Sequence, residues 1–264
     1  MPVSQPSFPS SLPFPGKVAV VTGAAQGIGA AVTHALAAQG IMVAALDIRA
    51  EAVTGAGDGA QVRARALDVT DAAAVRDVVE SVERELGPIG MLVNAAGVLR
   101  MGSVLEQEAN DWARCFAVNT HGVHHLSREV ARHMRPRGQG SIVTVGSNAA
   151  LVPRMRMAAY AASKAATHQF VKCLGLELAG SGIRCNIVAP GSTDTPMLRG
   201  MWCDRGAEQD VVDGSLTSYR CGIPLGRIAT AQDVANAVLF LLSDVSRHVT
   251  LHTLCVDGGA TLGQ

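Results

Sequence analysis

Short apolar stretches alternate with longer helix-like stretches along nearly the whole chain. The apolar stretches are rich in Val, Ile and Ala and lie at residues 17–22, 41–47, 62–69, 89–94, 140–147, 183–189 and 252–256. Between them lie segments rich in Ala, Leu, Glu and Arg, at residues 27–39, 71–86, 108–135, 157–180 and 231–244. Apolar strands that alternate with helices of this length form βαβ units. The sequence therefore predicts an α/β fold with one doubly wound parallel sheet of about seven strands and helices on both faces.

Two segments stand outside this alternation. Residues 1–16 contain five prolines and four serines and lack the basic and apolar regions of a signal peptide, so they predict a disordered lead-in. Residues 191–224 interrupt the last passage from strand to helix and contain the large side chains Met197, Met201, Trp202 and Tyr219. An irregular segment this long is typical of a functional loop, and we expect a substrate lid. Residues 17–264, including this lid, are expected to form one Rossmann-fold domain.

Charge and cysteine content exclude several classes of protein. The chain has 22 Lys and Arg against 22 Asp and Glu, so no basic surface for nucleic acid is expected. Apolar residues make up 48% of the chain, but no run approaches the roughly 18 residues of a membrane-spanning helix. The six cysteines are scattered and form no CxxC pair, which argues against a metal site and favours reduced thiols in a cytoplasmic enzyme.

A glycine-rich turn follows the first predicted strand and opens the first predicted helix. Gly23, Gly27 and Gly29 lack a Cβ atom at the points where a tight turn, a close approach to a pyrophosphate and close packing of helix on strand require it. The N–H groups at the start of the helix can bind a phosphate. Because the turn has a strand before it and a helix after it, it predicts a dinucleotide-binding Rossmann fold rather than an ordinary turn.

Acidic residues at two later strand ends suggest how the nucleotide is recognised. Asp47 ends the second predicted strand, where a carboxylate can accept hydrogen bonds from the adenosine ribose and repel a 2′-phosphate. Arg49 argues for the phosphorylated cofactor instead, but Asp47 lies at the strand end itself, so we predict NAD over NADP. Asp68 can face the adenine amino group, or it can belong to the N-terminal cap of the next helix.

A tyrosine, a lysine and a serine suggest acid–base chemistry. Tyr160 and Lys164 are four residues apart in a helical segment and therefore share one helix face. A nearby ammonium stabilises a phenolate and lowers the pKa of the phenol toward the range of a general base. Ser147 ends the preceding strand, where its hydroxyl could orient an alcohol. This spacing alone is common on helix surfaces. The glycine-rich turn in the same chain favours the interpretation of Tyr160 and Lys164 as a catalytic pair.

Taken together, these motifs resemble those of the short-chain dehydrogenase/reductase family. The resemblance extends from Lys17 to about Gly263. It rests on Thr22-Gly23-x-x-x-Gly27-x-Gly29, Asn94-Ala95-Ala96-Gly97, Asn119, Ser147, Tyr160-x-x-x-Lys164, Pro190-Gly191, Thr195 and Val256-Asp257-Gly258-Gly259. So many motifs in the same order exclude a chance match.

The resemblance implies a role for each of these positions. Tyr160 would be the catalytic base, Lys164 would lower its pKa and hold the nicotinamide ribose, Ser147 would bind the reacting oxygen, and Asn119 would hold a water in a proton relay. Asn94 would support the central sheet near the adenosine. The cofactor would be bound by Gly23, Gln26, Gly27, Ile28, Gly29, Asp47, Asp68, Val69, Asn94, Ala95, Gly97, Tyr160, Lys164, Pro190, Gly191, Thr193 and Thr195. The family also implies a homotetramer, assembled through the long helices at 108–135 and 157–180.

Longer stretches are similar to one branch of the family, the 2,3-dihydro-2,3-dihydroxybenzoate dehydrogenases of siderophore pathways. These stretches are 94–102, 142–150, 153–154, 191–195 and 254–263. The implied reaction is oxidation of the C3 alcohol of a cyclohexadiene carboxylic acid, followed by aromatisation. The hydride leaves C3, so the same chemistry also allows an amine at C2. We expect 2,3-dihydro-2,3-dihydroxybenzoate as the substrate, and 2,3-dihydro-3-hydroxyanthranilate stays open as the alternative.

Both candidate substrates carry a carboxylate, which a guanidinium binds well. Arg154 is the first candidate because it lies shortly after Ser147 and shortly before Tyr160, with Arg100 and Arg156 behind it. Met197 is expected to cover the substrate ring. Two other functions compete with the dehydrogenase: an NADP-dependent ketoacyl or carbonyl reductase, and a silent dinucleotide-binding regulator. The intact set of Ser147, Tyr160 and Lys164 argues against the regulator.

Overall fold

The computed structural model describes residues 12–57, 60–201 and 207–263, and a parallel seven-stranded sheet forms its centre. In spatial order the strands are β11, β6, β5, β4, β1, β2 and β3, and every neighbouring pair is parallel. Their bounds are β1 (Val18–Thr22), β2 (Met42–Asp47), β3 (Val62–Ala66), β4 (Ile89–Asn94), β5 (Gly140–Val145), β6 (Ile183–Pro190) and β11 (Thr253–Val256). The predicted doubly wound sheet is thus confirmed. Its strand order reverses between β1 and β4, where such sheets bind ligands at the carboxyl ends of the strands.

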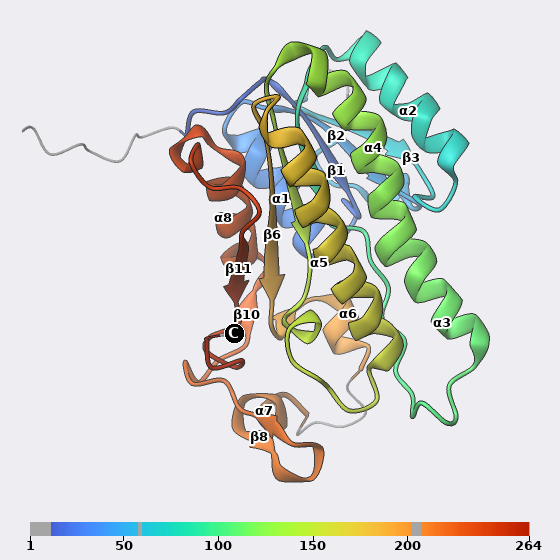
Figure 1. Ribbon diagram of the computed structural model, residues 1–264, viewed down its shortest axis with the longest axis vertical. Helices are drawn as coiled ribbons and strands as arrows, with labels where there is room; N and C mark the ends of the chain where they lie inside the picture. Colours follow the sequence, from blue (N-terminus) through green and yellow to red (C-terminus); the bar gives the residue numbers. More distant parts are fainter. Residues whose placement is uncertain (1–11, 58–59, 202–206, 264) are drawn as a thin grey trace, which may run out of the picture.

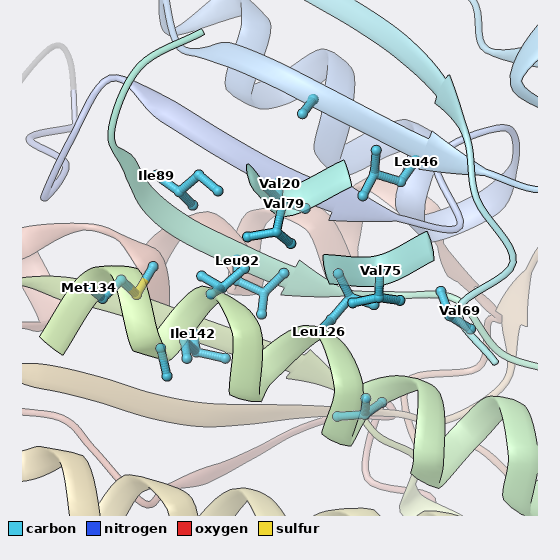
Figure 2. Close-up of a cluster of buried hydrophobic side chains, with 14 of the residues drawn as sticks. Val20, Leu46, Val69, Val75, Val79, Ile89, Leu92, Leu126, Met134 and Ile142 are labelled. Carbon is cyan, nitrogen blue, oxygen red and sulfur yellow. The ribbon is translucent and has the colours of Figure 1, made fainter. Parts of the chain in front are cut away.

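Helices cover both faces of the sheet (Figure 1). One face carries α1 (Gly27–Ala38) and α8 (Ala231–Leu242), and the other carries α2 (Ala72–Glu85), α4 (Val123–Met134) and α5 (Ala158–Ala179). Each face has its own cluster of buried apolar side chains. Figure 2 shows part of the cluster under α2 and α4, where strand residues Val20, Leu46, Ile89, Leu92 and Ile142 meet Val75, Val79, Leu126 and Met134. Because both faces are covered, the strands are apolar throughout.

The predicted helix at 108–135 is interrupted by a π-helical segment. The chain forms α3 (Ala109–Phe116), then η2 (Ala117–Gly122) with π geometry, and then α4. The carbonyl of Asn119, inside η2, accepts a hydrogen bond of 2.7 Å from the Thr167 hydroxyl on α5. Single π turns of this kind often occur at functional sites. Apolar periodicity alone does not distinguish such a turn from a continuous helix.

The end of the expected lead-in belongs to the folded body. Leu12 and Phe14 are partly buried against the cluster under α1 and α8, and the Pro13 carbonyl accepts a hydrogen bond of 2.8 Å from the Asp244 amide. The expectation of disorder is therefore wrong for residues 12–16, because two apolar side chains among the prolines find a place in the core. Residues 1–11 lie outside the described residues.

The expected lid, residues 191–224, contains several short elements. They are β7 (Thr193–Asp194), α6 (Pro196–Arg199), α7 (Ala207–Asp213), β8 (Gly214–Ser215) and β9 (Arg220–Cys221); β7 pairs with β10 (Ala229–Thr230). β8 and β9 form an antiparallel hairpin that, with α7, lies beyond the carboxyl ends of β6 and β11 (Figure 1). Tyr219 is 89% exposed at the hairpin tip and covers nothing, and Trp202 lies outside the described residues. Closure of this segment over a substrate stays a prediction.

The remaining short turns are 3₁₀ helices at the ends of the longer elements. They are η1 (Ala50–Ala52), η3 (Arg135–Arg137), η4 (Asn148–Ala150), η5 (Leu216–Ser218) and η6 (Asp244–Ser246). None of the helices in the described part of the chain is long and apolar enough to cross a membrane. Within the same residues, no three His, Cys, Asp or Glu side chains gather in a way that could hold a metal ion.

Candidate active site

The glycine-rich turn between β1 and α1 leaves room that side chains would fill. A Cβ atom on Gly23 would lie 2.8 Å from the backbone of Ala96, and one on Gly29 would overlap the Gly23 carbonyl. Gly23 and Gly27 also have positive φ angles of 65° and 56°, which disfavour any other residue. The turn therefore packs against the loop after β4, and its backbone lies open to a ligand.

The N-terminus of α1 has no side-chain cap. Gln26 occupies the N-cap position in an extended conformation, but its side chain accepts no hydrogen bond from the first turn. In α2, by contrast, Asp71 accepts hydrogen bonds from the amides of Ala73 and Ala74. The first amides of α1 are thus left for a ligand, and together with the positive end of the helix dipole they fit a phosphate group.

A cleft of about 240 Å³ lies at this end of the sheet. Its walls come from the glycine turn, the ends of β2 and β3, the loop after β4, and the start of α6. They include many of the predicted cofactor residues, namely Gly23, Gln26, Gly27, Ile28, Gly29, Asp47, Asp68, Val69, Ala95, Gly97 and Thr195. Met197, predicted to lie over the substrate, also lines this cleft and is 38% exposed.

Asp47 is held in place by backbone amides at the end of β2. One carboxylate oxygen accepts a hydrogen bond of 3.0 Å from the Ala25 amide, and the other accepts one of 3.0 Å from the Arg49 amide. The Arg49 guanidinium donates a hydrogen bond of 2.7 Å to the Gln26 side chain. Both charges thus line the same wall of the cleft, with the carboxylate fixed more tightly than the guanidinium.

Asp68 also lines the cleft, and it organises a turn. One carboxylate oxygen accepts hydrogen bonds from the amide and the hydroxyl of Thr70, at 2.9 and 2.8 Å. The bond from the Thr70 amide is the main cause that lowers the pKa of Asp68 below its usual value. Asp71, rather than Asp68, caps α2. Asp68 is therefore a charged carboxylate in the cleft wall, as expected for a residue that faces a nucleotide.

Six predicted cofactor residues lie outside the walls of this cleft, and two of them, Tyr160 and Lys164, belong to the buried site described next. Asn94 is 2% exposed, and its side-chain amide donates hydrogen bonds to the hydroxyls of Ser127 on α4 and Thr144 on β5. It thus supports the sheet and does not face the cleft. The three others, at and after the end of β6, are Pro190, Gly191 and Thr193. Thr193 is 5% exposed and pairs with β10, so its contact with the cofactor stays a prediction.

Ser147, Tyr160 and Lys164 come together in a buried site beside the cleft. They are 6%, 9% and 5% exposed, and they come from the end of β5 and the first turns of α5. The Lys164 ammonium donates a hydrogen bond of 2.8 Å to the Val145 carbonyl and lies 5.9 Å from the centre of the Tyr160 ring. Gly97 connects this site to the cleft, since a Cβ atom there would lie 3.7 Å from the Lys164 nitrogen.

Burial governs the electrostatics of the tyrosine and the lysine. It raises the pKa of Tyr160 above its usual value, and the nearby Ser147 hydroxyl opposes this rise. It lowers the pKa of Lys164 from 10.5 to about 8. The pKa of Tyr160 is thus raised and not lowered as expected, because desolvation of the buried phenol is its largest cause.

Asn119 is fully buried, and its side chain binds neighbouring segments. Its oxygen accepts a hydrogen bond of 2.9 Å from the Val98 amide, and its nitrogen donates bonds of 3.0 Å to the Val98 carbonyl and the Ser163 hydroxyl. These bonds tie the loop after β4 to α5 and so keep Gly97 beside Lys164. The role of Asn119 in holding a water stays a prediction.

Comparison with known proteins decides the family. A family model described as enoyl-(acyl carrier protein) reductase matches residues 23–261. The 2,3-dihydro-2,3-dihydroxybenzoate dehydrogenase of Bacillus subtilis (strain 168) is 51% identical over 253 residues, which cover 94% of this chain and 97% of that protein. The chain belongs to the short-chain dehydrogenase/reductase family.

Further members of the family are similar over the same length. The 2,3-dihydro-2,3-dihydroxybenzoate dehydrogenase of Escherichia coli (strain K12) is 44% identical, covering 95% of this chain and 99% of that protein. A gluconate 5-dehydrogenase from Burkholderia cenocepacia J2315, solved with NADP and tartrate, superposes with a TM-score of 0.86 at 31% identity and covers 96% of this chain and 97% of its own. The fold and its nucleotide-binding end are thus those of a short-chain dehydrogenase/reductase.

His168 is a buried residue of this site that the sequence analysis missed. Its Nε2 accepts a hydrogen bond of 3.3 Å from the Ser147 amide, and it is 5% exposed. Burial, followed by the charges of Lys164 and Lys172, lowers its pKa to about 4, so the ring is neutral at pH 7 with its proton on Nδ1. Its position four residues after Lys164, on the same helix face, was the signal available in the sequence. His168 positions the serine.

Replacing His168 with leucine is expected to lower kcat about tenfold, because the Ser147 amide loses its buried partner. His168→Gln should retain most of the activity, since the glutamine oxygen can reach the place of Nε2. Both variants should leave the KM for the cofactor unchanged. Steady-state kinetics with thermal melting as a control for folding measure this. Equal activity of the leucine and glutamine variants would contradict a positioning role.

The predicted substrate residues lie on neighbouring loops. Arg100, at the end of the loop after β4, forms an ion pair of 3.2 Å with Asp111 on α3 and is 48% exposed. It already has a carboxylate partner, which makes it a poor substrate ligand. Arg154 lies half-buried in the loop between η4 and α5, whereas Arg156 is exposed. Contact of either arginine with a substrate stays a prediction.

Proposed function

We propose that this protein oxidises the C3 hydroxyl of 2,3-dihydro-2,3-dihydroxybenzoate with NAD and yields 2,3-dihydroxybenzoate. The observation that carries the proposal is the buried group of Ser147, Tyr160 and Lys164 beside the nucleotide cleft. The relatives named for this reaction support the substrate, because they are 51% and 44% identical over nearly the full chain. Siderophore or secondary-metabolite biosynthesis is the pathway class that follows.

The residues around the cleft fit a dinucleotide cofactor. Gly23, Gly27 and Gly29 leave the backbone open, the first turn of α1 has amides free for the pyrophosphate, and Asp47 and Asp68 stand where the adenosine half would lie. A bound NAD would supply the acceptor for the hydride. The further residues proposed to hold it are Thr193 and Thr195 with the Pro190–Gly191 turn, and the ammonium of Lys164 for the ribose.

The chain's own residues would then handle the proton and the alcohol. Ser147 is the N-cap of η4, and its hydroxyl oxygen accepts a hydrogen bond of 3.1 Å from the Ala149 amide, which leaves the hydroxyl proton for the substrate oxygen. Tyr160 would remove the proton of the C3 hydroxyl as the hydride leaves C3. Lys164, charged below pH 8, would stabilise the phenolate. The resulting ketone loses its C2 proton and becomes the phenol, and aromatisation favours the product.

NAD is proposed over NADP because the Asp47 carboxylate would repel a 2′-phosphate. The kcat/KM for NAD should therefore exceed that for NADP. In Asp47→Ala, the kcat/KM for NAD should fall about tenfold, and the ratio of the kcat/KM for NAD to that for NADP should decrease. Glu51→Ala is the matched control, since it removes a nearby exposed carboxylate outside the cleft. A wild-type enzyme that prefers NADP would contradict the assignment.

The direct test is an NAD-reduction assay with two substrates side by side. One arm contains 2,3-dihydro-2,3-dihydroxybenzoate and the other 2,3-dihydro-3-hydroxyanthranilate. The proposal predicts faster reduction with the dihydroxy acid. Faster reduction with 2,3-dihydro-3-hydroxyanthranilate would assign the same chemistry to that substrate. Turnover of a ketoacyl substrate alone would refute both diene acids as substrates. We also propose that the enzyme works as a homotetramer, for which Leu176 on α5, 71% exposed, offers an apolar contact.

A further inference from the structure

Two half-buried arginines, Arg154 and Arg220, lie toward the Ser147 end of the site and form no ion pair with a carboxylate among the described residues. Arg154 lies in the loop before α5, and Arg220 lies in β9. Within the described residues, every ion pair of an arginine involves other positions, namely Arg65, Arg84, Arg100, Arg128, Arg132, Arg137, Arg199 and Arg227. The two guanidiniums are close enough for the charge of Arg154 to lower the pKa of Arg220, after burial as the larger cause.

A hydrogen bond to Ser192 holds Arg220 beside the end of β6, the strand next to β5. Its guanidinium donates a hydrogen bond of 2.7 Å to the Ser192 hydroxyl. Ser192 follows Gly191, where a Cβ atom would lie 3.2 Å from the Asn148 amide nitrogen, and Asn148 follows Ser147. The sequence-distant hairpin thus brings Arg220 to the Ser147 end of the site. Arg154 lies in the loop after η4, close enough to Arg220 for its charge to act on that guanidinium.

Two positive charges at such a place repel each other and lose hydration. An anion between them relieves both costs, and a planar carboxylate offers each guanidinium an oxygen. The substrate of the proposed reaction has one carboxylate, on the ring carbon beside C2, while the reacting hydroxyl at C3 belongs near Ser147 and Tyr160. When C3 faces Tyr160, the substrate carboxylate therefore lies near Ser147, and a cationic site is needed there to bind it.

We propose that Arg154 and Arg220 together bind the substrate carboxylate, with Ser192 holding Arg220 in position. The proposal rests on the proposed function for the identity of the acid. In it, the hairpin β8–β9 contributes a charged ligand for the substrate, Arg220, and not only apolar side chains that cover it. The site selects ring acids over neutral ring diols.

The test measures binding of two ligands to the enzyme with NAD bound, by calorimetry. One ligand is the product 2,3-dihydroxybenzoate, and the other is catechol, which lacks the carboxylate. The variants are Arg154→Met, Arg220→Met and Arg220→Lys. Arg247→Met is the control, because Arg247 is an exposed arginine in the segment after α8 and far from the described cleft. Thermal melting verifies that each variant folds.

Wild type should bind the acid more tightly than catechol. Each methionine variant should weaken binding of the acid about 10- to 100-fold and leave catechol nearly unchanged, which is the loss expected for a charged hydrogen-bonded pair. The affinity of Arg220→Lys for the acid should lie between those of wild type and Arg220→Met, because an ammonium cannot bind a carboxylate in the bidentate manner. The KM for the substrate should rise in the same order, with smaller changes in kcat. Arg247→Met should behave as wild type.

Two results would overturn the inference. One is a wild-type enzyme without preference for the acid, and the other is an Arg220→Met variant that folds and retains the full preference. The proposed function fails separately, through the absence of NAD reduction with either diene acid. If turnover is absent but both arginines still govern binding of the acid, the anion site stands and the reaction must be sought among other ring acids.

Discussion

Replacing Tyr160 with phenylalanine is expected to lower kcat about a thousandfold, the scale of a lost general base. The phenol hydroxyl is the group that we propose takes the substrate proton, and phenylalanine keeps the ring that packs with Cys115, Ala149 and Ala159 in the buried cluster. Affinity for NAD should change little, because the cleft walls stay intact. Steady-state kinetics and NAD titration measure the two effects.

The fold of the Tyr160→Phe variant should equal that of wild type, since the substitution removes only the hydroxyl beside Ser147 and leaves the buried ring in place. Ser147→Ala provides a second variant in which the reacting oxygen loses its partner. If Tyr160→Phe turned over substrate at the wild-type rate, another residue would be the base. Loss of NAD binding in parallel would mean that the substitution disturbed the cleft.

Lys164→Met is expected to abolish most activity and to change how stability depends on pH. Burial lowers the pKa of Lys164 from 10.5 to about 8. Folding therefore disfavours the charged lysine, and this penalty is fully present below pH 8. As pH rises from 8 toward 10.5, the folded protein has lost the proton while the unfolded chain still holds it, so the unfolded state binds more protons and wild type gains stability.

The methionine variant lacks this titration. Between pH 7 and pH 10, the free energy of unfolding of wild type should thus rise by about 2 kcal/mol relative to that of Lys164→Met. Denaturant unfolding of both proteins over this range measures the shift. Lys172→Met, on the same helix, controls for the loss of one positive charge. A difference that stays constant with pH would show that Lys164 keeps its ordinary pKa in the folded protein.

The sheet and the nucleotide cleft could be predicted because their signals are local in the sequence. A strand such as β1 is apolar throughout because both faces of the sheet are covered, and Gly23 and Gly29 are glycines because neighbouring backbone leaves no room for a Cβ atom. Tyr160 and Lys164 share a helix face through their spacing alone. These features need no knowledge of distant parts of the chain.

The features that were missed depend on contacts between distant segments. Arg220 reaches Ser192 from a hairpin 28 positions further along the chain, and no periodicity links the two. The π turn around Asn119 accepts a hydrogen bond from the Thr167 hydroxyl of another helix. Leu12 and Phe14 are partly buried, although the prolines around them by themselves favour disorder. Composition describes such a segment on average, whereas packing is decided by individual side chains.

The central claim is that the hydride leaves C3 while Tyr160 takes the hydroxyl proton. It is tested most directly with 2,3-dihydro-2,3-dihydroxybenzoate carrying deuterium at C3, incubated with the enzyme and NAD. The account predicts that the deuterium appears on the reduced nicotinamide and that the 2,3-dihydroxybenzoate formed carries none. Deuterium that remains in the aromatic ring or passes to water, with unlabelled reduced cofactor, would contradict it.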